Sequence, residues 1–143
     1  MRIKDILTAK PSSEVVTISP DAPVRDLIAL LAEHNIGAVI VSSDGSTVTG
    51  IVSERDVVRR LGTGTGVLEA SVHEIMTVDV QTCAGEDSLT DLMKTMTERR
   101  IRHLPVVADG RLTGIISIGD VVKHRIDELE FERDQLDHYV HQT

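Results

Sequence analysis

The stretches GIVSERD at residues 50–56 and GIISIGD at residues 114–120 are nearly identical, in a chain of only 143 residues. Each contains an apolar β-branched run that ends in a serine, and an aspartate follows three residues after that serine. The similarity extends outward on both sides. Because an internal repeat fixes the architecture of a chain, it is the first feature to interpret.

The repeat covers most of the chain. Residues 16–60 align with residues 81–124, at an offset of 65 that becomes 64 after one residue is lost in a turn. Even the segments before the repeats match, since KDILT at 4–8 resembles HEIMT at 73–77. We call these two segments the leaders. The chain is therefore two copies of one unit.

Each copy has the pattern of a β-α-β-β-α unit. A short strand, VVTI or VQTC, precedes a helix, and an Asp-Gly turn separates two later strands before a second helix begins at Glu54 or Ile118. Neither unit of roughly 50 residues would be stable alone. We therefore expect an α/β fold (α+β mixed), with two repeats packed sheet to sheet around a shared core in pseudo-twofold symmetry. The first helices carry apolar residues at helical spacing: Val24, Leu27, Ile28 and Leu31, and Leu89, Leu92, Met93 and Met96.

The repeats divide the chain into residues 1–66, 67–126 and a helical extension at 127–143. A Gly-Thr-Gly-Thr-Gly run at 62–66 is a flexible linker. It is not a dinucleotide-binding loop, because the sixth position is Val67 rather than glycine and the preceding segment is helical.

Composition excludes several classes. With 41% hydrophobic and 27% charged residues the chain is globular, and its apolar runs are too short to span a membrane. A formal net charge of -8 argues against nucleic acid, and the 1% aromatic content offers no base-stacking platform. The charged N-terminus and the single cysteine, Cys83, favour a cytoplasmic location.

The Ser-x-x-Asp pairs, Ser53 with Asp56 and Ser117 with Asp120, allow two interpretations. The first is a capping box, in which serine and acid satisfy the amides of a helix start. The second is a paired ligand site, because a helix N-terminus attracts anions and a carboxylate accepts hydrogen bonds from ribose hydroxyls. The presence of two equivalent copies favours the second interpretation.

With these features the chain resembles the cystathionine-β-synthase (CBS) domain family, as a stand-alone tandem pair or Bateman module. GIVSERDVV and GIISIGDVV, NIGAVIV and RIRHLPVV, and the strand starts VVTI and VQTC carry the resemblance. It implies a non-catalytic sensor that binds AMP, ADP, ATP, NAD(H) or S-adenosylmethionine as a regulatory ligand between its repeats. The ligand would change the packing of repeats and subunits, and a protein partner would detect that change.

The resemblance also implies two ligand sites, each built from both repeats. The first would combine the first Ser-x-x-Asp with residues of the second repeat: Ser53, Asp56, Gln81, Thr82, Arg102, His103 and Leu104. The second would combine the second Ser-x-x-Asp with residues of the first repeat: Ser117, Asp120, Val16, Thr17, Gly37, Ala38 and Val39.

The two sites should differ in ligand. Arg102 and His103 would bring positive charge to the first site, which we expect to prefer a charged nucleotide; the alternative for Arg102 is an ordinary solvated side chain. At Gly37 and Ala38 a ligand can approach the backbone closely, but these residues carry no charge. A bare adenosine portion or NAD(H) therefore suits the second site. Gly119 would only loosen the start of the second helix.

No constellation for catalysis is visible. The six histidines lack metal-ligand spacing, His138 and His141 on the tail included, and Cys83 fits a small buried side chain better than a nucleophile. No cofactor and no metal are expected. The rival hypotheses are a structural dimerisation subunit with empty clefts, an enzyme acting on a nucleotide, and a DNA-binding protein, which the charge disfavours.

The final helix continues past the second repeat with a heptad-like apolar stripe. Packing on its own domain and dimerisation explain the stripe equally well, because both need one apolar face. The resemblance favours a homodimer. The stripe consists of Val122, Ile126, Leu129, Leu136 and Val140, with Arg133 interrupting it.

Overall fold

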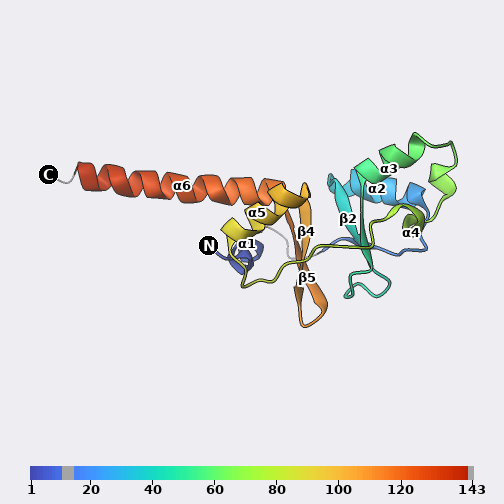
Figure 1. Ribbon diagram of the computed structural model, residues 1–143, viewed down its shortest axis with the longest axis horizontal. Coiled ribbons are helices and arrows are strands. Elements are labelled where there is room, and N and C mark those ends of the chain that lie inside the picture. The colour runs from blue at the N-terminus through green and yellow to red at the C-terminus, as the bar shows by residue number, and fades with distance from the viewer. Residues whose placement is uncertain (11–14, 142–143) are drawn as a thin grey trace.

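The computed structural model describes residues 1–10 and 15–141, and both repeats are present in it (Figure 1). The first repeat consists of β1 (Thr17–Ile18), α2 (Val24–His34), β2 (Ala38–Val41), β3 (Gly50–Ser53) and α3 (Glu54–Leu61). The second consists of α5 (Leu89–Arg99), β4 (His103–Ala108), β5 (Arg111–Ser117) and α6 (Ile118–Val140). The leaders form α1 (Ile3–Ala9) and α4 (Val72–Ile75), the latter preceded by the short 3-10 helix η1 (Val67–Glu69).

The helices α2 and α5 form where the apolar spacing predicted them. Both bury three residues of that spacing and expose their polar faces. Both end at a residue in the left-handed conformation, Asn35 at φ 52° and Arg100 at φ 55°, which turns the chain sharply into the next strand. The equivalent helices of the two repeats are thus bounded in the same way.

The two sheets differ at their first strand. In the first repeat β1 pairs in parallel with β2, which pairs antiparallel with β3. In the second repeat β4 and β5 form a hairpin, but the strand expected at VQTC is reduced to one bridge between Cys83 and Val106. Pro105 explains the difference, since it has no amide hydrogen to extend this ladder toward Gln81. The expectation of a full strand there was wrong.

The buried apolar residues form two clusters rather than the single shared core expected from the sequence. One cluster contains α2, β2 and β3 together with η1 and α4. The other contains α5, β4 and β5 together with α1. Each core is therefore completed by the leader of the other repeat, because the strands and helices of one repeat leave an apolar face that a further helix must cover. Both halves of the mixed α/β fold depend on this exchange.

Backbone hydrogen bonds fix the exchanged leaders in the same way in both halves. In each half, the first residue of the repeat's first helix (α2 or α5) donates its amide to the segment before the leader helix. The first residue of the leader helix donates its amide to the segment before α2 or α5. The bonds are Val24 N to Ala70 O at 2.9 Å, Val72 N to Ala22 O at 2.9 Å, Leu89 N to Met1 O at 3.0 Å and Ile3 N to Asp87 O at 3.0 Å.

The glycine that opens each GI-S motif makes room for the exchanged leader. A Cβ atom on Gly50 would lie 2.8 Å from Met76 Sδ and 2.8 Å from the carbonyl oxygen of Thr77. A Cβ atom on Gly114 would lie 2.6 Å from Leu7 Cδ2. Because these distances are shorter than van der Waals contact, a side chain at either glycine would push the leader away.

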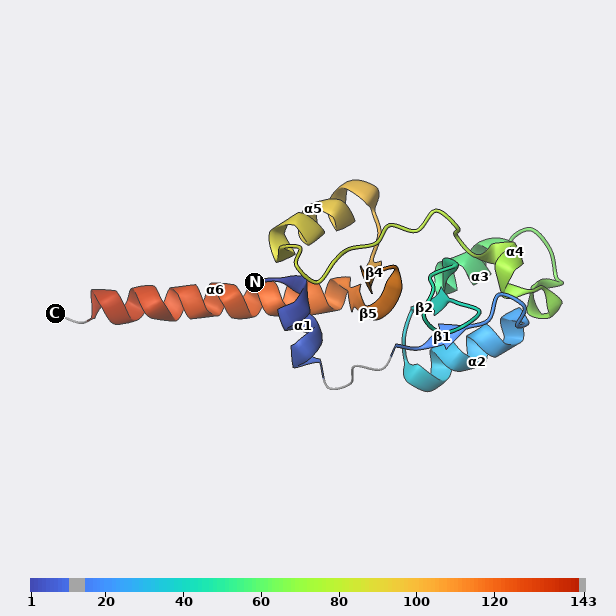
Figure 2. The same ribbon diagram turned by 90° about the horizontal axis from the view of Figure 1, so that it is seen from below.

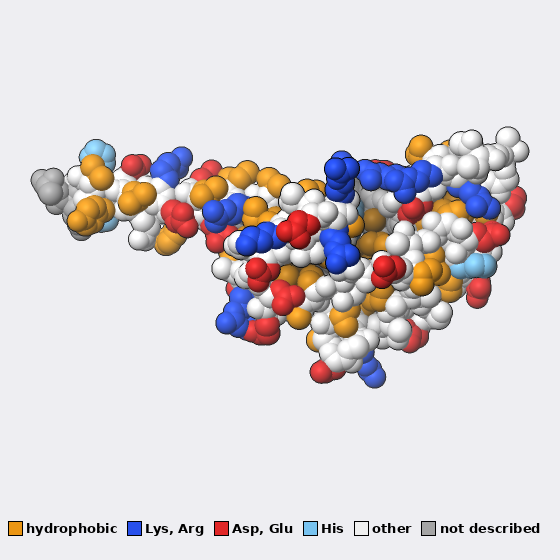
Figure 3. All heavy atoms as spheres, in the orientation of Figure 1, with side chains coloured by type: hydrophobic (Ala, Val, Ile, Leu, Met, Phe, Trp, Pro, Cys, Tyr) orange, Lys and Arg blue, Asp and Glu red, His pale blue; other side chains and the backbone are white. Residues whose placement is uncertain are grey.

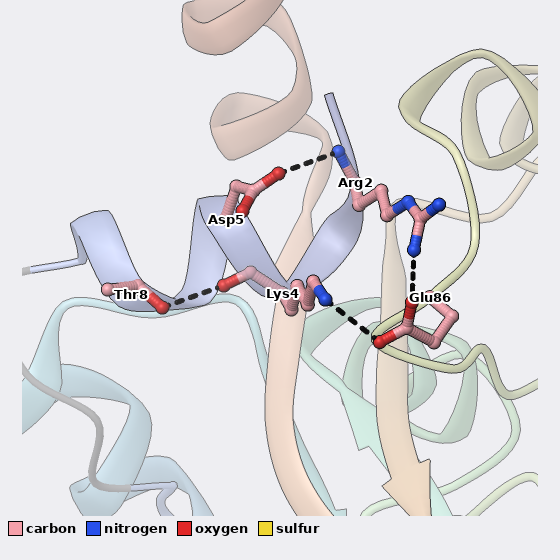
Figure 4. A network of polar contacts seen from close by, with 5 residues as sticks. All are labelled: Arg2, Lys4, Asp5, Thr8 and Glu86. Atoms are coloured by element: carbon pink, nitrogen blue, oxygen red, sulfur yellow. Dashed lines mark hydrogen bonds and ion pairs between the residues drawn. The ribbon is translucent and has the colours of Figure 1, made fainter.

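Side chains add to the attachment of α1. Lys4 Nζ lies 3.0 Å from Glu86 Oε1, and Arg2 pairs with the other oxygen of the same carboxylate (Figure 4). The Asp5 carboxylate accepts from Arg2 N at 3.1 Å and caps the start of the helix. The carboxylate of Glu86 thus joins α1 to the loop before α5.

The helix α6 runs without a break for 23 residues through the boundary expected at residue 126. Two perpendicular views show its C-terminal half projecting from the body of the molecule (Figures 1 and 2). None of the helices in residues 1–10 and 15–141 has the length and apolarity needed to cross a membrane.

Candidate functional site

A cavity of about 650 Å³ lies between the first Ser-x-x-Asp motif and the segment that leads into β4. Both repeats contribute to its walls. From the first come Gly37, Ala38, Ile51, Ser53, Glu54, Arg55, Asp56, Val58 and Arg59; from the second repeat and its leader come Thr77, Arg100, Ile101, Arg102 and His103.

The Ser53–Asp56 motif starts α3 at the wall of this cavity. Asp56 Oδ2 accepts from Ser53 N at 2.8 Å and from Ser53 Oγ at 3.1 Å, which is the capping box predicted as one interpretation. Within the described residues the other carboxylate oxygen of Asp56 accepts no hydrogen bond. The cap and a ligand site are therefore compatible, because capping occupies one oxygen and leaves the second for a hydroxyl group.

The cavity wall is rich in positive charge. Four arginines line it, against the two acids Glu54 and Asp56. Arg55 and Arg59 are one helical turn apart on α3, and Arg100 and Arg102 flank the turn between α5 and β4. Figure 3 shows Lys and Arg side chains gathered above α3 and the adjoining end of α5, on a chain whose net charge is -8. An anionic ligand is attracted to such a site.

His103 lies between the two Ser-x-x-Asp motifs. It lines the cavity, and a Cβ atom added to Gly37 would lie 3.9 Å from its Cε1. Its backbone pairs with Ser117 on the next strand. Burial lowers the pKa of His103 below its ordinary value, and Arg102 and Lys10 act in the same direction, whereas the carboxylates of Asp120 and Glu54 oppose the shift.

Of the residues expected in the first site, Ser53, Asp56, Arg102 and His103 come together in this cavity. Leu104 does not line it, because it is 1% exposed in the core of the second repeat, and neither do Gln81 and Thr82. Gly37 and Ala38, expected in the second site, line the same cavity as Ser53. The pairing of Ala38 with Ser53 on adjacent strands explains that position.

The second motif has a different neighbour. Lys10, at the end of α1, places its Nζ 3.0 Å from Asp120 Oδ2 and 3.0 Å from the carbonyl oxygen of Ile115. Burial raises the pKa of Asp120, but hydrogen bonds from the Ser117 amide and from Lys10 outweigh it, so the net shift is downward. Of the other residues expected there, Val39 is 1% exposed in the first core, and Val16 and Thr17 are half-buried at β1.

Comparison with known proteins identifies the fold. The family model of the CBS domain matches residues 3–63 and again residues 72–127. The chain belongs to the CBS domain family. The resemblance stated from the sequence is confirmed, as is the mixed α/β fold of a CBS pair. The first match begins within α1, so each CBS unit in sequence includes the leader that packs in the other core.

Individual CBS proteins match over most of this chain. A crystal structure of a CBS-domain containing protein from Agrobacterium tumefaciens is 44% identical, with a TM-score of 0.82 over 87% of this chain and 99% of that one. A mitochondrial CBS domain-containing protein of Arabidopsis thaliana is 32% identical over 96% of this chain and 71% of its own length. A CBS domain protein from Pyrobaculum aerophilum, solved as a complex with AMP, is 24% identical, with a TM-score of 0.74 over 84% of this chain and 89% of that one.

Sequence reasoning about the CBS pair missed several residues of the cavity wall. Arg55 and Arg59 could have been found from their spacing of four on the helix that starts at Glu54. Arg100 has no comparable signal, because a charged run such as Glu98-Arg99-Arg100 is typical of a solvated helix end. Thr77 belongs to the exchanged leader, and only the three-dimensional packing brings it beside Ile51.

The described part of the chain contains no group of side chains arranged to hold a metal ion. Burial, with a further contribution from Asp87, raises the pKa of the Cys83 thiol to about 12. Since the thiolate is the reactive form, Cys83 is unsuited to act as a nucleophile near neutral pH.

Proposed function

We propose that this CBS protein is a non-catalytic sensor of a phosphorylated adenosine ligand, such as AMP, ADP, ATP or NAD(H), bound in the cavity beside Ser53. The observation that carries the proposal is the joining of a Ser-x-x-Asp helix start from one repeat with Arg100, Arg102 and His103 from the other. The helix start suits a ribose, and guanidinium groups suit phosphate oxygens.

The charge of the wall narrows the ligand class. Four arginines favour a ligand with at least one phosphate over S-adenosylmethionine, whose sulfonium is cationic. The Pyrobaculum protein complexed with AMP and a CBS domain pair solved with 5′-methylthioadenosine and S-adenosyl-L-methionine support an adenosine-containing ligand without favouring a phosphate, and both resemble this chain in fold only. Bound ligand would contact both repeats, and so it would favour one relative packing of them over another.

We further propose that the protein acts in the cytoplasm as a homodimer, whose change of packing is detected by a protein partner. The rival hypothesis is a structural dimerisation subunit with empty clefts. It predicts a protein whose stability does not respond to any nucleotide.

A thermal-shift screen against AMP, ADP, ATP, NAD+, NADH and S-adenosylmethionine tests the proposal. A ligand at 100 times its dissociation constant stabilises the folded state by about 2.7 kcal/mol. Asp56→Ala and Arg102→Ala should each reduce the shift, whereas Asp79→Ala, at an exposed position that does not line the cavity, should leave it intact. The absence of a shift with every ligand would favour the structural subunit.

A further inference from the structure

Helix α6 carries an apolar stripe that its own domain covers only in part, and the stripe continues into the projecting half. Val122, Ile126 and Leu129 are 50%, 48% and 47% exposed, and Leu136 and Val140 are each 65% exposed. These residues follow steps of four, three, seven and four, so they lie on one face of the helix. Arg133 takes the remaining position, and its guanidinium pairs with Asp134 at 3.2 Å. Packing of the stripe on its own domain, one of the two explanations open from the sequence, accounts for about half of the surface of Val122, Ile126 and Leu129 and for less of Leu136 and Val140.

Charged residues flank the stripe in an ordered way. Lys123, Glu130 and Asp137 follow one edge at intervals of seven, and Arg125 and Glu132 follow the other. On both edges the basic residue lies toward the start of α6 and the acidic residues lie toward its end. None of these residues forms an ion pair with any other within residues 1–10 and 15–141.

We propose that α6 pairs with α6 of a second copy of the chain in the antiparallel direction. A twofold axis perpendicular to α6 relates two antiparallel helices. It places each edge of the stripe against the same edge of the partner helix, which runs in the opposite direction. Lys123 then lies near the partner's Glu130, and Arg125 near the partner's Glu132, twice each by symmetry. These pairs place the twofold axis near residues 127–128, so Val122, Ile126 and Leu129 pack against the partner's stripe and Leu136 packs against the start of the partner's α6.

Parallel pairing fits the same sequence less well. It would bring Arg133 against the partner's Arg133 within the apolar seam, and it would place Glu132 beside the partner's Asp137. Like charges at these distances repel. A parallel pair would also set Arg125 beside the partner's Glu130, but the two repulsive contacts offset that attraction. The reversed pair sets opposite charges together on both edges, so the ordered charges favour a second copy in the antiparallel direction.

The inference refines the proposed homodimer and does not depend on ligand binding. A dimer held by the repeats themselves would not need the half of α6 beyond the second repeat. The two arrangements differ in the residues that hold the copies together. They can therefore be separated by substitutions on α6 that leave both cores untouched.

Sedimentation velocity over a series of protein concentrations tests the apolar stripe. Leu136→Gln should raise the dimer dissociation constant roughly tenfold or more, because each dimer loses two buried leucines. Phe131→Gln is the matched control, since Phe131 is also 65% exposed but faces away from the stripe. Circular dichroism should show equal helix content in both variants.

Charge reversal tests the direction of pairing. In an antiparallel pair, Arg125→Glu and Glu132→Arg should each weaken the dimer, and the double variant should restore it. In a parallel pair, Glu132→Arg would strengthen the dimer, because it would replace repulsion from the partner's Asp137 by attraction; that result would overturn the inference.

Two further outcomes also overturn it, and they have different meanings for the proposed function. A dimer that is unaffected by Leu136→Gln would be held by the repeats, so the proposed homodimer would stand and the pairing of α6 would be wrong. A wild-type protein that is monomeric at every concentration would refute both.

Discussion

The two aspartates of the repeated motif occupy different local environments although their sequences are equivalent. The carboxylate of Asp56 faces the cavity, whereas that of Asp120 is engaged by the ammonium of Lys10. The side chains of Lys10 and Asp120 are 26% and 24% exposed, so their ion pair is partly shielded from solvent. A ligand that approaches Asp120 must therefore displace or recruit Lys10, a condition that does not apply at Asp56.

Replacement of Lys10 by methionine should reduce the free energy of unfolding by about 1 kcal/mol near neutral pH, since the pair is only partly buried. The folded-state pKa of Asp120 is lowered, so the stabilisation is complete above the unfolded pKa near 3.9 and is lost as the pH falls through the lower folded value. Urea denaturation at pH 7 and pH 3 measures this difference.

Lys4→Met is the control for that experiment, because Lys4 lies on the same helix in an exposed pair with Glu86. It should have a smaller effect at pH 7. An equal loss of stability at both pH values in Lys10→Met would show that Lys10 acts through packing rather than through the charge of Asp120.

His103 should make ligand affinity dependent on pH. The pKa of His103 is lower in the folded protein than in the unfolded chain, where it is about 6.5. As the pH falls from 6.5 toward the folded pKa, the unfolded chain binds more protons than the folded protein, so the stability of the ligand-free protein falls. A phosphate in the cavity would favour the protonated imidazole. Affinity for ADP should therefore rise by up to about tenfold from pH 8 to pH 5.5.

Titration calorimetry in buffers of different ionisation enthalpy would measure the accompanying proton uptake. His103→Gln should abolish that part of the pH dependence, while the titration of the ligand's own phosphate persists in both proteins. Identical pH profiles for the wild type and the variant would exclude His103 from phosphate recognition.

At the scale of elements, the exchange of leaders explains both glycines of the repeated motif. Gly50 lies against Met76 and the carbonyl oxygen of Thr77, and Gly114 lies against Leu7. A flexible side chain such as Leu7 can move, but the backbone of Thr77 also forms a bridge with Ile51 and cannot move without breaking it. The two glycines should therefore differ in their tolerance of a side chain.

Gly50→Ala should destabilise the protein by about 1–3 kcal/mol through overpacking, and Gly114→Ala should destabilise it less. Gly64→Ala, in the linker, provides the control because a Cβ atom there meets nothing within 4 Å. Chemical denaturation of the three variants gives the comparison. If Gly114→Ala were the most harmful, the relative rigidity assigned to the two contacts would be wrong.

Local patterns predicted the elements well and their partners poorly. Apolar spacing placed α2 and α5, and the Ser-x-x-Asp motif placed the starts of α3 and α6. No strand forms at residues 81–82 because Pro105, on the neighbouring strand β4, cannot donate a backbone hydrogen bond to them. Pro105 is far from these residues in sequence, so a local pattern does not reveal the effect. The exchange of leaders left no local signal, because α1 and α4 have similar apolar patterns and would suit either core.

The same limit applies to the candidate site. The motif predicted Ser53 and Asp56, and the resemblance added Arg102 and His103, all of which line the cavity. Arg100 and Thr77 depend on how the two repeats meet, which no single-repeat pattern encodes. Gly37 and Ala38 line this cavity because β2 is paired with β3 in a register that sets Ala38 opposite Ser53.

At the scale of the whole molecule, neither repeat has a complete core of its own. The first cluster includes Val67 and Val72 from the segment before the second repeat, and the second includes Ile3 and Ile6 from the segment before the first. The chain passes from one cluster to the other twice, between Ile6 and Ile18 and again between Val72 and Leu89, so the two halves are joined at two points. The two repeats should behave as one thermodynamic unit.

Differential scanning calorimetry should show a single transition, with calorimetric and van't Hoff enthalpies that agree. Val52→Ala, which leaves a cavity in the first core only, should move that transition to lower temperature without splitting it. Two resolved transitions, or a shoulder that appears only in Val52→Ala, would mean that the halves unfold independently in spite of the exchanged leaders.

The exchange of leaders also gives the linker at residues 62–66 a particular meaning. A chain with only one repeat could complete its core by trading leaders with a second copy of itself, in an association that depends on concentration. Covalent connection makes the same trade intramolecular, at an effective concentration set by the linker rather than by the abundance of the protein. The two repeats therefore pair as two separate copies would, but because they are covalently linked, dilution does not separate them.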